Sequence, residues 1–157
     1  MPPNLGYMYC ATIDALAFTT ATDIFEITVT SDAPIYIARL HLCQTTDLGD
    51  AAEEVLRIGV YTGATAGSTG TSLTENPWNR ADLPSVTAAI VANRGTASTG
   101  GTLKDIIGWN IRIPLDYIYT PDDAPRVDSG EDVMTYKLLS APTDSITISG
   151  SIKWWEG

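Results

Sequence analysis

Apolar and polar side chains alternate along much of this chain, and this period of two predicts β-strands. Phe25, Ile27 and Val29 alternate with polar residues, which is the pattern of a strand with one buried and one solvated face. Turn-forming residues follow at 31–34, and alternation resumes at 35–43. We therefore expect 25–30 and 35–43 to form a hairpin. In the second strand, one face is predicted to carry Tyr36, Ala38, Leu40 and Leu42, and the other Ile37, Arg39, His41 and Cys43.

Four later segments alternate in the same way. Their predicted inward faces are Leu56, Ile58 and Val60 in 55–61; Trp109, Ile111, Ile113 and Leu115 in 109–116; Met134, Tyr136 and Leu138 in 134–138; and Ile146, Ile148, Gly150, Ile152 and Trp154 in 146–154. We expect Trp109 and Trp154 to lie in the core. Pro114 lacks a backbone donor and predicts a sheet edge or a bulge at its strand end. The last strand is predicted to pair centrally with an early strand.

Residues that punctuate strands occupy the segments between them. The segments 62–71 and 95–102 consist almost wholly of Gly, Ala, Ser and Thr, which bury little surface and cost backbone entropy to order. We expect both to be surface loops, the first of them mobile. The acidic segment 47–54 is also predicted to be a loop, and 86–91 is predicted to be an edge strand.

These signals predict an all-β fold in a single domain. The chain has 157 residues, an ordinary length for one domain with its own core. About eight strands separated by turns, without an amphipathic helix between them, favour an antiparallel β-sandwich or jelly roll. We expect 1–20 to form an N-terminal arm and the first strand, and 21–157 to form the sandwich.

The negative charge of the chain disfavours some classes of partner. The formal net charge is −10 and the pI is near 4.2, so the field of the protein repels phosphate backbones and anionic headgroups. Nucleic acid and membrane surfaces are therefore not expected partners. The first residues lack the basic start and apolar run of a secretory signal, and no apolar stretch reaches the roughly 18 residues of a membrane span.

Residues that support catalysis are sparse. His41 is the single histidine, and Cys10 and Cys43 are the two cysteines, so neither a nucleophile with its base nor a zinc site is predicted. We expect both cysteines to be free thiols. The acidic loop Asp122–Asp132 has a spacing unlike an EF-hand, and whether it binds calcium stays open. We predict no enzymatic activity, no metal and no cofactor.

Exposed aromatic residues are the better functional signal. Trp155 is predicted to alternate outward and Trp78 lies in a Pro-flanked loop; such side chains contact another protein chain or stack on sugars. The apolar arm 1–9 is too short to fold alone, so it gains order against a neighbour, covers its own sheet or frays. The candidate contact residues are Leu5, Tyr7, Tyr9, Tyr61, Trp78, Leu139 and Trp155.

The order of several motifs along the chain matches a known layout. The motifs are Ser31-Asp32-Ala33-Pro34, then 44–51 and 56–60, a Gly/Thr-rich loop, Asn76-Pro77-Trp78, 108–112, and the terminal 146–156. In this layout, which covers most of the chain, the protein resembles the jelly-roll capsid decoration proteins of tailed bacteriophages, also called cement or head-stabilisation proteins.

This resemblance implies a structural role in a virion. It implies a protein made in the host cytoplasm that binds the major capsid protein on the outer capsid surface, as a homo-oligomer and in particular a trimer. Such a ligand stabilises the assembled shell because it binds only that state. The alternative is a carbohydrate- or receptor-binding module of a phage tail or head fibre, which predicts a groove lined by Trp78 or Trp155.

Overall fold

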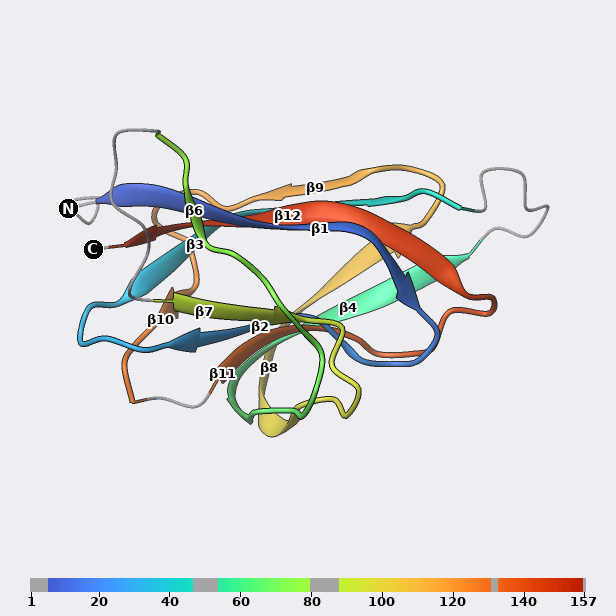
Figure 1. The fold of residues 1–157 in the computed structure, drawn as a ribbon, viewed down its shortest axis with the longest axis horizontal. Coiled ribbons are helices and arrows are strands. Elements are labelled where there is room, and N and C mark those ends of the chain that lie inside the picture. The colour runs from blue at the N-terminus through green and yellow to red at the C-terminus, as the bar shows by residue number, and fades with distance from the viewer. Residues whose placement is uncertain (1–5, 47–53, 80–87, 131–132, 157) are drawn as a thin grey trace.

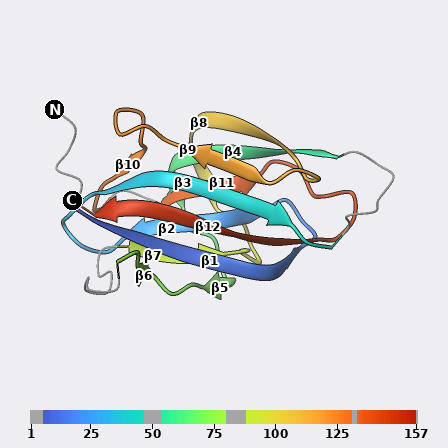
Figure 2. The ribbon, with the colours of Figure 1, turned by 90° about the horizontal axis from the view of Figure 1, so that it is seen from above.

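The protein is built from β-strands in two stacked layers. The computed structural model describes residues 6–46, 54–79, 88–130 and 133–156, whose strands form two six-stranded antiparallel sheets. Figure 1 shows the two layers, and Figure 2 looks onto one of them, sheet A. The predicted all-β sandwich is confirmed. The described residues contain no helix long and apolar enough to cross a membrane.

Sheet A contains the first and the last strand. Its members are β1 (Tyr7–Phe18), β3 (Ile35–Gln44), β6 (Asn76–Pro77), β9 (Leu115–Ile118), β10 (Arg126–Val127) and β12 (Ile146–Glu156). Their order is β10, β3, β12, β1, β6, and β9 also pairs with β3. The predicted central position of the last strand is confirmed, because β12 lies between β1 and β3 (Figure 2).

Sheet B forms the second layer. Its members are β2 (Asp23–Val29), β4 (Val55–Thr65), β5 (Thr71–Ser72), β7 (Ala88–Ala92), β8 (Thr99–Asn110) and β11 (Val133–Leu138). Their order is β5, β7, β2, β11, β4, β8. The predicted edge strand over 86–91 is β7, which is second from the edge because the short β5 pairs with it. Of the loop expected over 47–54, only Glu54 lies within the described residues.

The chain pairs its main strands from the outside inward. β1 pairs with β12, β2 with β11, β3 with β9 and β4 with β8, all antiparallel. Successive pairs alternate between the two sheets, which is the arrangement of a jelly roll. These eight strands match the number expected from the sequence, and β5, β6, β7 and β10 lie beside them.

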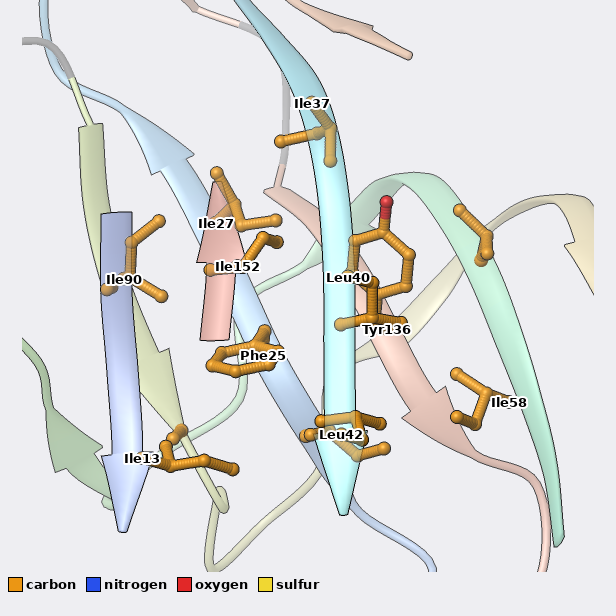
Figure 3. Packing of buried hydrophobic residues seen from close by; sticks show 14 of the residues in the cluster. Ile13, Phe25, Ile27, Ile37, Leu40, Leu42, Ile58, Ile90, Tyr136 and Ile152 are labelled. Carbon is orange, nitrogen blue, oxygen red and sulfur yellow. The ribbon is translucent and has the colours of Figure 1, made fainter. Parts of the chain in front are cut away.

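The core lies between the sheets and is filled by side chains that alternation places inward. Phe25 of β2, Tyr136 of β11 and Ile152 of β12 are fully buried, and Figure 3 shows them packed together between the two layers. Trp109 and Trp154 are buried as predicted. Each fully buried large apolar side chain contributes about 1.5–3 kcal/mol relative to exposure, so this interface holds the two sheets together.

A β-bulge in β3 shifts the alternation of that strand. The register between β3 and β12 changes at Ala38, which has no partner on β12. Such an extra residue reverses the facing of the side chains on one side of it. Ile37 is therefore buried together with Leu40, while Tyr36 is only partly buried. The predicted grouping of Tyr36 with Leu40, and of Ile37 with Arg39, is wrong because a strict period of two does not allow for a bulge.

The predicted hairpin of 25–30 with 35–43 is also wrong. β2 lies in sheet B between β7 and β11, whereas β3 lies in sheet A beside β12. The chain at 30–34 therefore crosses from one layer to the other. A short turn between two alternating segments can form either a hairpin within one sheet or a crossover between two sheets. The alternation of side chains is the same in both cases and does not distinguish them.

The predicted strand over 109–116 is divided between the two sheets. β8 ends and β9 begins on either side of a turn at 111–114, where the chain crosses between layers. Ile113 is exposed in this turn, and the Trp109 Nε1–H donates a hydrogen bond to its carbonyl oxygen at 2.8 Å. Pro114, which has no N–H to donate, falls at the crossover, where no ladder hydrogen bond is lost.

The two Gly-, Ser- and Thr-rich segments pair with each other. Residues 62–65 continue β4 and pair with 99–102 of β8, and Ser68 forms an isolated bridge with Thr96. A Cβ on Gly67 would lie 2.3 Å from the Thr96 carbonyl oxygen, so glycine permits this close approach. The predicted surface loops are wrong for the paired residues, because backbone hydrogen bonds supply the order that side-chain burial does not.

Two buried carboxylates hold these segments against β2. Asp23 accepts hydrogen bonds from the backbone N–H and the hydroxyl of Ser98, each at 2.7 Å. Glu26 accepts a hydrogen bond from the Gly67 N–H at 2.8 Å and forms an ion pair with Arg94. Burying a carboxylate is costly unless it is paired and hydrogen-bonded, and these contacts meet that need.

Candidate functional site: an aromatic hollow on sheet A

A hollow of about 260 Å³ lies on the outer face of sheet A. It is lined by Met8, Ala38, Arg39, Trp78, Ile118, Lys153 and Trp155. Five of these side chains are apolar and two are cationic. They come from β1, β3, β9, β12 and the residue after β6, so the hollow exists only when the sheet is assembled.

Strand register brings the two predicted tryptophans together. Met8 pairs with Trp155 across β1 and β12, and paired residues lie on the same face of a sheet. β6 pairs with β1 next to them, and the Trp78 N–H donates a hydrogen bond to the Met8 carbonyl oxygen at 2.8 Å. Trp78 and Trp155 therefore line one hollow although they are far apart along the chain.

The bulge of β3 contributes to the shape of the hollow. The bulged residue Ala38 lines it with only a methyl group. The Tyr119 N–H donates a hydrogen bond to the Ala38 carbonyl oxygen at 3.0 Å, which keeps the end of β9 and its exposed Ile118 beside the bulge. A longer side chain at position 38 would occupy part of the hollow.

Lys153 supplies a positive charge to the hollow. Its Nζ lies 3.3 Å from the centroid of the Trp78 ring, the geometry of a cation–π contact. Burial, and next the positive charge of Arg39, lower the pKa of Lys153. Among the described residues, no carboxylate forms an ion pair with it.

Arg39, the second cation, is held in a fixed orientation. Its guanidinium donates two hydrogen bonds to the Asp116 carboxylate, at 2.6 Å and 2.8 Å, which is the bidentate geometry of strong arginine–carboxylate pairs. This hydrogen bonding lowers the pKa of Asp116. Asp116 is therefore ionised at neutral pH, and Arg39 cannot turn freely into the hollow.

The structure separates the other predicted contact residues of the N-terminal arm from the hollow. Tyr9 belongs to β1 and is only 3% exposed, so its side chain is part of the core. Tyr7 is 60% exposed, but it precedes Met8 and alternation directs it to the opposite side of β1. Leu5 lies outside the described residues. The hollow thus keeps Trp78 and Trp155 from the predicted set.

Tyr61 and Leu139 meet on the opposite face of the molecule. A Cβ on Gly59 would lie 2.7 Å from Tyr61 Cε2 and 2.8 Å from Leu139 Cδ2, so both side chains cover this glycine on the outer face of sheet B. Leu103, the cross-strand partner of Tyr61, and Ile106, the partner of Gly59, extend the apolar surface and are 43% and 47% exposed. We call Tyr61, Leu103, Ile106 and Leu139 the sheet B patch.

His41 lies on the same face of sheet A as the hollow, between Ser151 and Asp116 on the neighbouring strands. The His41 Nδ1 is 3.9 Å from Asp116 Oδ1, beyond hydrogen-bond distance, and Arg39 already binds that carboxylate. No side-chain hydrogen bond joins His41 to Ser151 in the described part of the chain. Ser151, His41 and Asp116 therefore lack the side-chain contacts that link a nucleophile to its base.

The acidic loop Asp122–Asp132 is described only in part, since Glu131 and Asp132 lie outside the described residues. Asp128 forms an ion pair with Arg126 at 2.6 Å. Within the described ranges, no group of three or more His, Cys, Asp or Glu side chains is placed to hold a metal ion.

The two cysteines are free, as expected. Cys10 pairs with Lys153 and Cys43 pairs with Ser149 on β12, so the thiols lie on opposite sides of that strand. Burial raises the pKa of Cys10, which keeps its thiol protonated and unreactive at neutral pH.

Lys153 and Arg39, the cationic half of the hollow, were not among the residues predicted from the sequence. A signal for Lys153 existed, because it lies two residues before Trp155 on the outward face of the predicted last strand. The alternation correctly placed Arg39 on one face with His41 and Cys43, but no sequence signal showed that Asp116 would lie beside it.

Comparisons of the chain with protein-family models, with curated proteins and with solved structures found no match.

Proposed function

We propose that this protein is a structural binding protein that docks onto the outer surface of a phage capsid as a decoration protein. The observation that carries the proposal is the hollow, in which the predicted contact residues Trp78 and Trp155 meet on the outer face of sheet A. Trp78 is 56% exposed and Ile118 is 66% exposed. Exposed apolar surface gathered around a concave site is typical of protein–protein interaction.

A second apolar surface supports an assembling role. The hollow lies on the outer face of sheet A and the sheet B patch on the outer face of sheet B, so one chain presents two contact surfaces in opposite directions. A decoration protein that acts as a trimer needs two kinds of contact, one with the shell and one with its own copies. We assign the hollow to the major capsid protein and the sheet B patch to self-association in a homotrimer.

The proposed role is binding without turnover. It is supported by the arrangement around His41, where the described side chains do not form a hydrogen-bonded catalytic group. Binding to an assembled shell, and not to free subunits, stabilises the shell by the binding free energy at every site.

A carbohydrate-binding module is the second candidate. One observation favours it: the hollow combines Trp155 with the Arg39–Asp116 pair, and sugar sites unite an aromatic surface with fixed polar groups. One observation opposes it, because the Lys153 ammonium covers one face of the Trp78 ring and removes that face from stacking.

Co-sedimentation with capsids tests the proposal. Heads of the phage that encodes the chain, prepared without the protein, are incubated with wild-type protein, with Trp78→Ala and with Ile113→Ala. Ile113 is also exposed, at 62%, but does not line the hollow, so it is the matched control. We expect the wild type and Ile113→Ala to sediment with the heads and Trp78→Ala to lose at least ten-fold in affinity.

Light scattering tests self-association independently. We expect a trimer for the wild type and a smaller mass for Leu103→Glu, which places a charge in the sheet B patch. Heads that bind none of the proteins, together with saturable binding of a glycan to the wild type alone, would replace the decoration role with the carbohydrate-binding one.

A further inference from the structure

The size of the hollow limits what it can bind. Its volume of about 260 Å³ is below the roughly 300–1,000 Å³ of typical small-molecule sites. It therefore suits one bulky side chain better than an extended ligand. A single aromatic or aliphatic anchor in a small pocket is how many protein interfaces concentrate their binding energy.

The charge of the hollow limits the partner further. Arg39, Lys153 and Asp116 leave one net positive charge at this site, although the chain as a whole carries −10. Glu156 points to the other side of β12, where Oε1 accepts a hydrogen bond from Trp154 Nε1 at 3.1 Å. The Debye length is about 8 Å at physiological ionic strength, so distant carboxylates act on an anion in the hollow far less than Lys153 does.

Lys153 is the cation of the hollow that has no ion-pair partner among the described residues. Its side chain is half-buried and its ammonium lies over the Trp78 ring. The other cation, Arg39, already has two hydrogen bonds to Asp116. An anion that enters the hollow therefore meets Lys153 as its natural counter-ion.

We infer that the hollow binds a segment of a partner protein in which an aromatic or large aliphatic side chain is flanked by a carboxylate. The apolar side chain enters the hollow beside Trp78 and Trp155, and the carboxylate pairs with Lys153 Nζ. This inference rests on the proposed function, because it states the chemistry of the partner at the same site. Complementary charge supplies specificity, while burial of the apolar side chain supplies most of the affinity.

A peptide titration followed by NMR tests the inference. The probe is acetyl-Gly-Glu-Phe-Glu-Gly-amide, and the comparison peptides replace both Glu by Gln, or Phe by Ala. The readouts are the indole N–H signals of Trp78 and Trp155 in ¹⁵N-labelled protein. We expect saturable shifts of both signals, with an affinity for the Glu peptide at least ten-fold above that for either comparison peptide.

Substitutions of lysine identify the group responsible. We expect Lys153→Met to bind the Glu and Gln peptides equally, and Lys153→Arg, which keeps the charge, to retain the preference. Lys104→Met is the matched control, because Lys104 is an exposed lysine on β8, and it should behave as the wild type. Equal affinity of the wild type for the Glu and Gln peptides, or an unchanged preference in Lys153→Met, would overturn the inference.

Three further results separate this inference from the proposed function. If Trp78→Ala loses capsid binding while Lys153→Met binds heads as tightly as wild type, the docking role stands and the acidic partner is refuted. If tri-galacturonate shifts the indole signals and the peptides do not, the ligand is an acidic sugar and the inference is refuted. If neither variant affects capsid binding, the hollow is not the docking site, and its assignment to the major capsid protein fails together with this inference.

Discussion

Two arginine–carboxylate pairs in this protein use the same chemistry in opposite surroundings. Arg94 pairs with Glu26 beneath the Gly-, Ser- and Thr-rich segments, where the side chains are 15% and 1% exposed. Arg39 pairs with Asp116 beside the hollow, where they are 36% and 42% exposed. The first pair is largely buried, whereas the second pair is exposed to water.

The difference shows why an ion pair cannot be valued from its geometry alone. Exposed pairs are screened by water and add little stability. Breaking a buried pair leaves one charge without compensation, which costs far more than the pair contributes when intact. Arg94 and Glu26 therefore serve the fold, while Arg39 and Asp116 serve the shape and charge of a surface.

Loss of one partner should give the largest contrast between the two regions. Arg94→Met leaves Glu26 buried without its cation, and we expect the free energy of unfolding to fall by about 3–5 kcal/mol. Arg39→Met is the matched substitution in the exposed pair and should leave the unfolding free energy unchanged within error. Urea unfolding followed by circular dichroism measures both. Equal losses in the two variants would contradict the comparison.

A smaller loss of unfolding free energy is expected at Asp23, a buried carboxylate that accepts hydrogen bonds from Ser98. Asp23→Asn turns one acceptor oxygen into a donor that faces the Ser98 N–H or hydroxyl, so we expect a loss of about 1–3 kcal/mol. Ser98→Ala removes the hydroxyl but keeps the backbone hydrogen bond, and it should cost less. The same urea experiment ranks the two, and a larger loss for Ser98→Ala would argue against the role given to Asp23.

Alkaline pH should weaken the interior before it alters the exposed pair. The Tyr136 hydroxyl donates a hydrogen bond to the Tyr119 hydroxyl at 3.1 Å, and burial raises the pKa of Tyr119 to about 12 and that of Tyr136 well above its ordinary value. A raised pKa in the folded state gives stability that is complete below the unfolded pKa and is lost as pH rises through the folded one.

The two raised pKa values define the pH range in which this stability is lost. From about pH 10 upward, unfolding free energy should fall by roughly 1.4 kcal/mol per pH unit for each of the two tyrosines. Urea unfolding between pH 9 and 11.5 measures the slope, and Tyr119→Phe should reduce it. An identical slope in Tyr119→Phe would show that other groups cause the alkaline loss.

Only a small effect on stability is expected from the loss of Trp78 in the hollow. Trp78→Ala removes an exposed ring and its contact with the Lys153 ammonium, so we expect the unfolding free energy to change by less than about 1 kcal/mol. The same variant is expected to lose capsid binding. A loss of stability as large as that of Arg94→Met would mean that Trp78 belongs to the fold and not to a docking surface.

Sequence reasoning recovered the layers but not the connections between them. Side-chain alternation records which face of a strand is buried, and it correctly placed Phe25, Trp109 and Trp154 in the core. It does not record which strand lies alongside, so the 25–43 hairpin and the single strand over 109–116 were predicted where the chain crosses between sheets. Both errors concern short connections, whose residues suit either path.

The site was predictable to the extent that alternation and turn residues mark exposed aromatics. Trp78 and Trp155 were both identified, but their meeting depends on the two-residue β6 pairing with β1, which has no signal of its own. The bulge at Ala38 was invisible for the same reason. Tyr9 shows the opposite limit, because an apolar residue near the start of the chain looks like part of a free arm until its strand is known to be paired.

The nesting of the strands has a consequence for how the protein is made. Because β1 pairs with β12 along its whole length, its main partner in sheet A is not available until the chain as far as Glu156 has been synthesised. Folds dominated by contacts between distant parts of the chain fold slowly, in milliseconds to seconds. We expect sheet A to close only once β12 has been synthesised, and the edge of β1 that pairs with β12 lacks that partner until then.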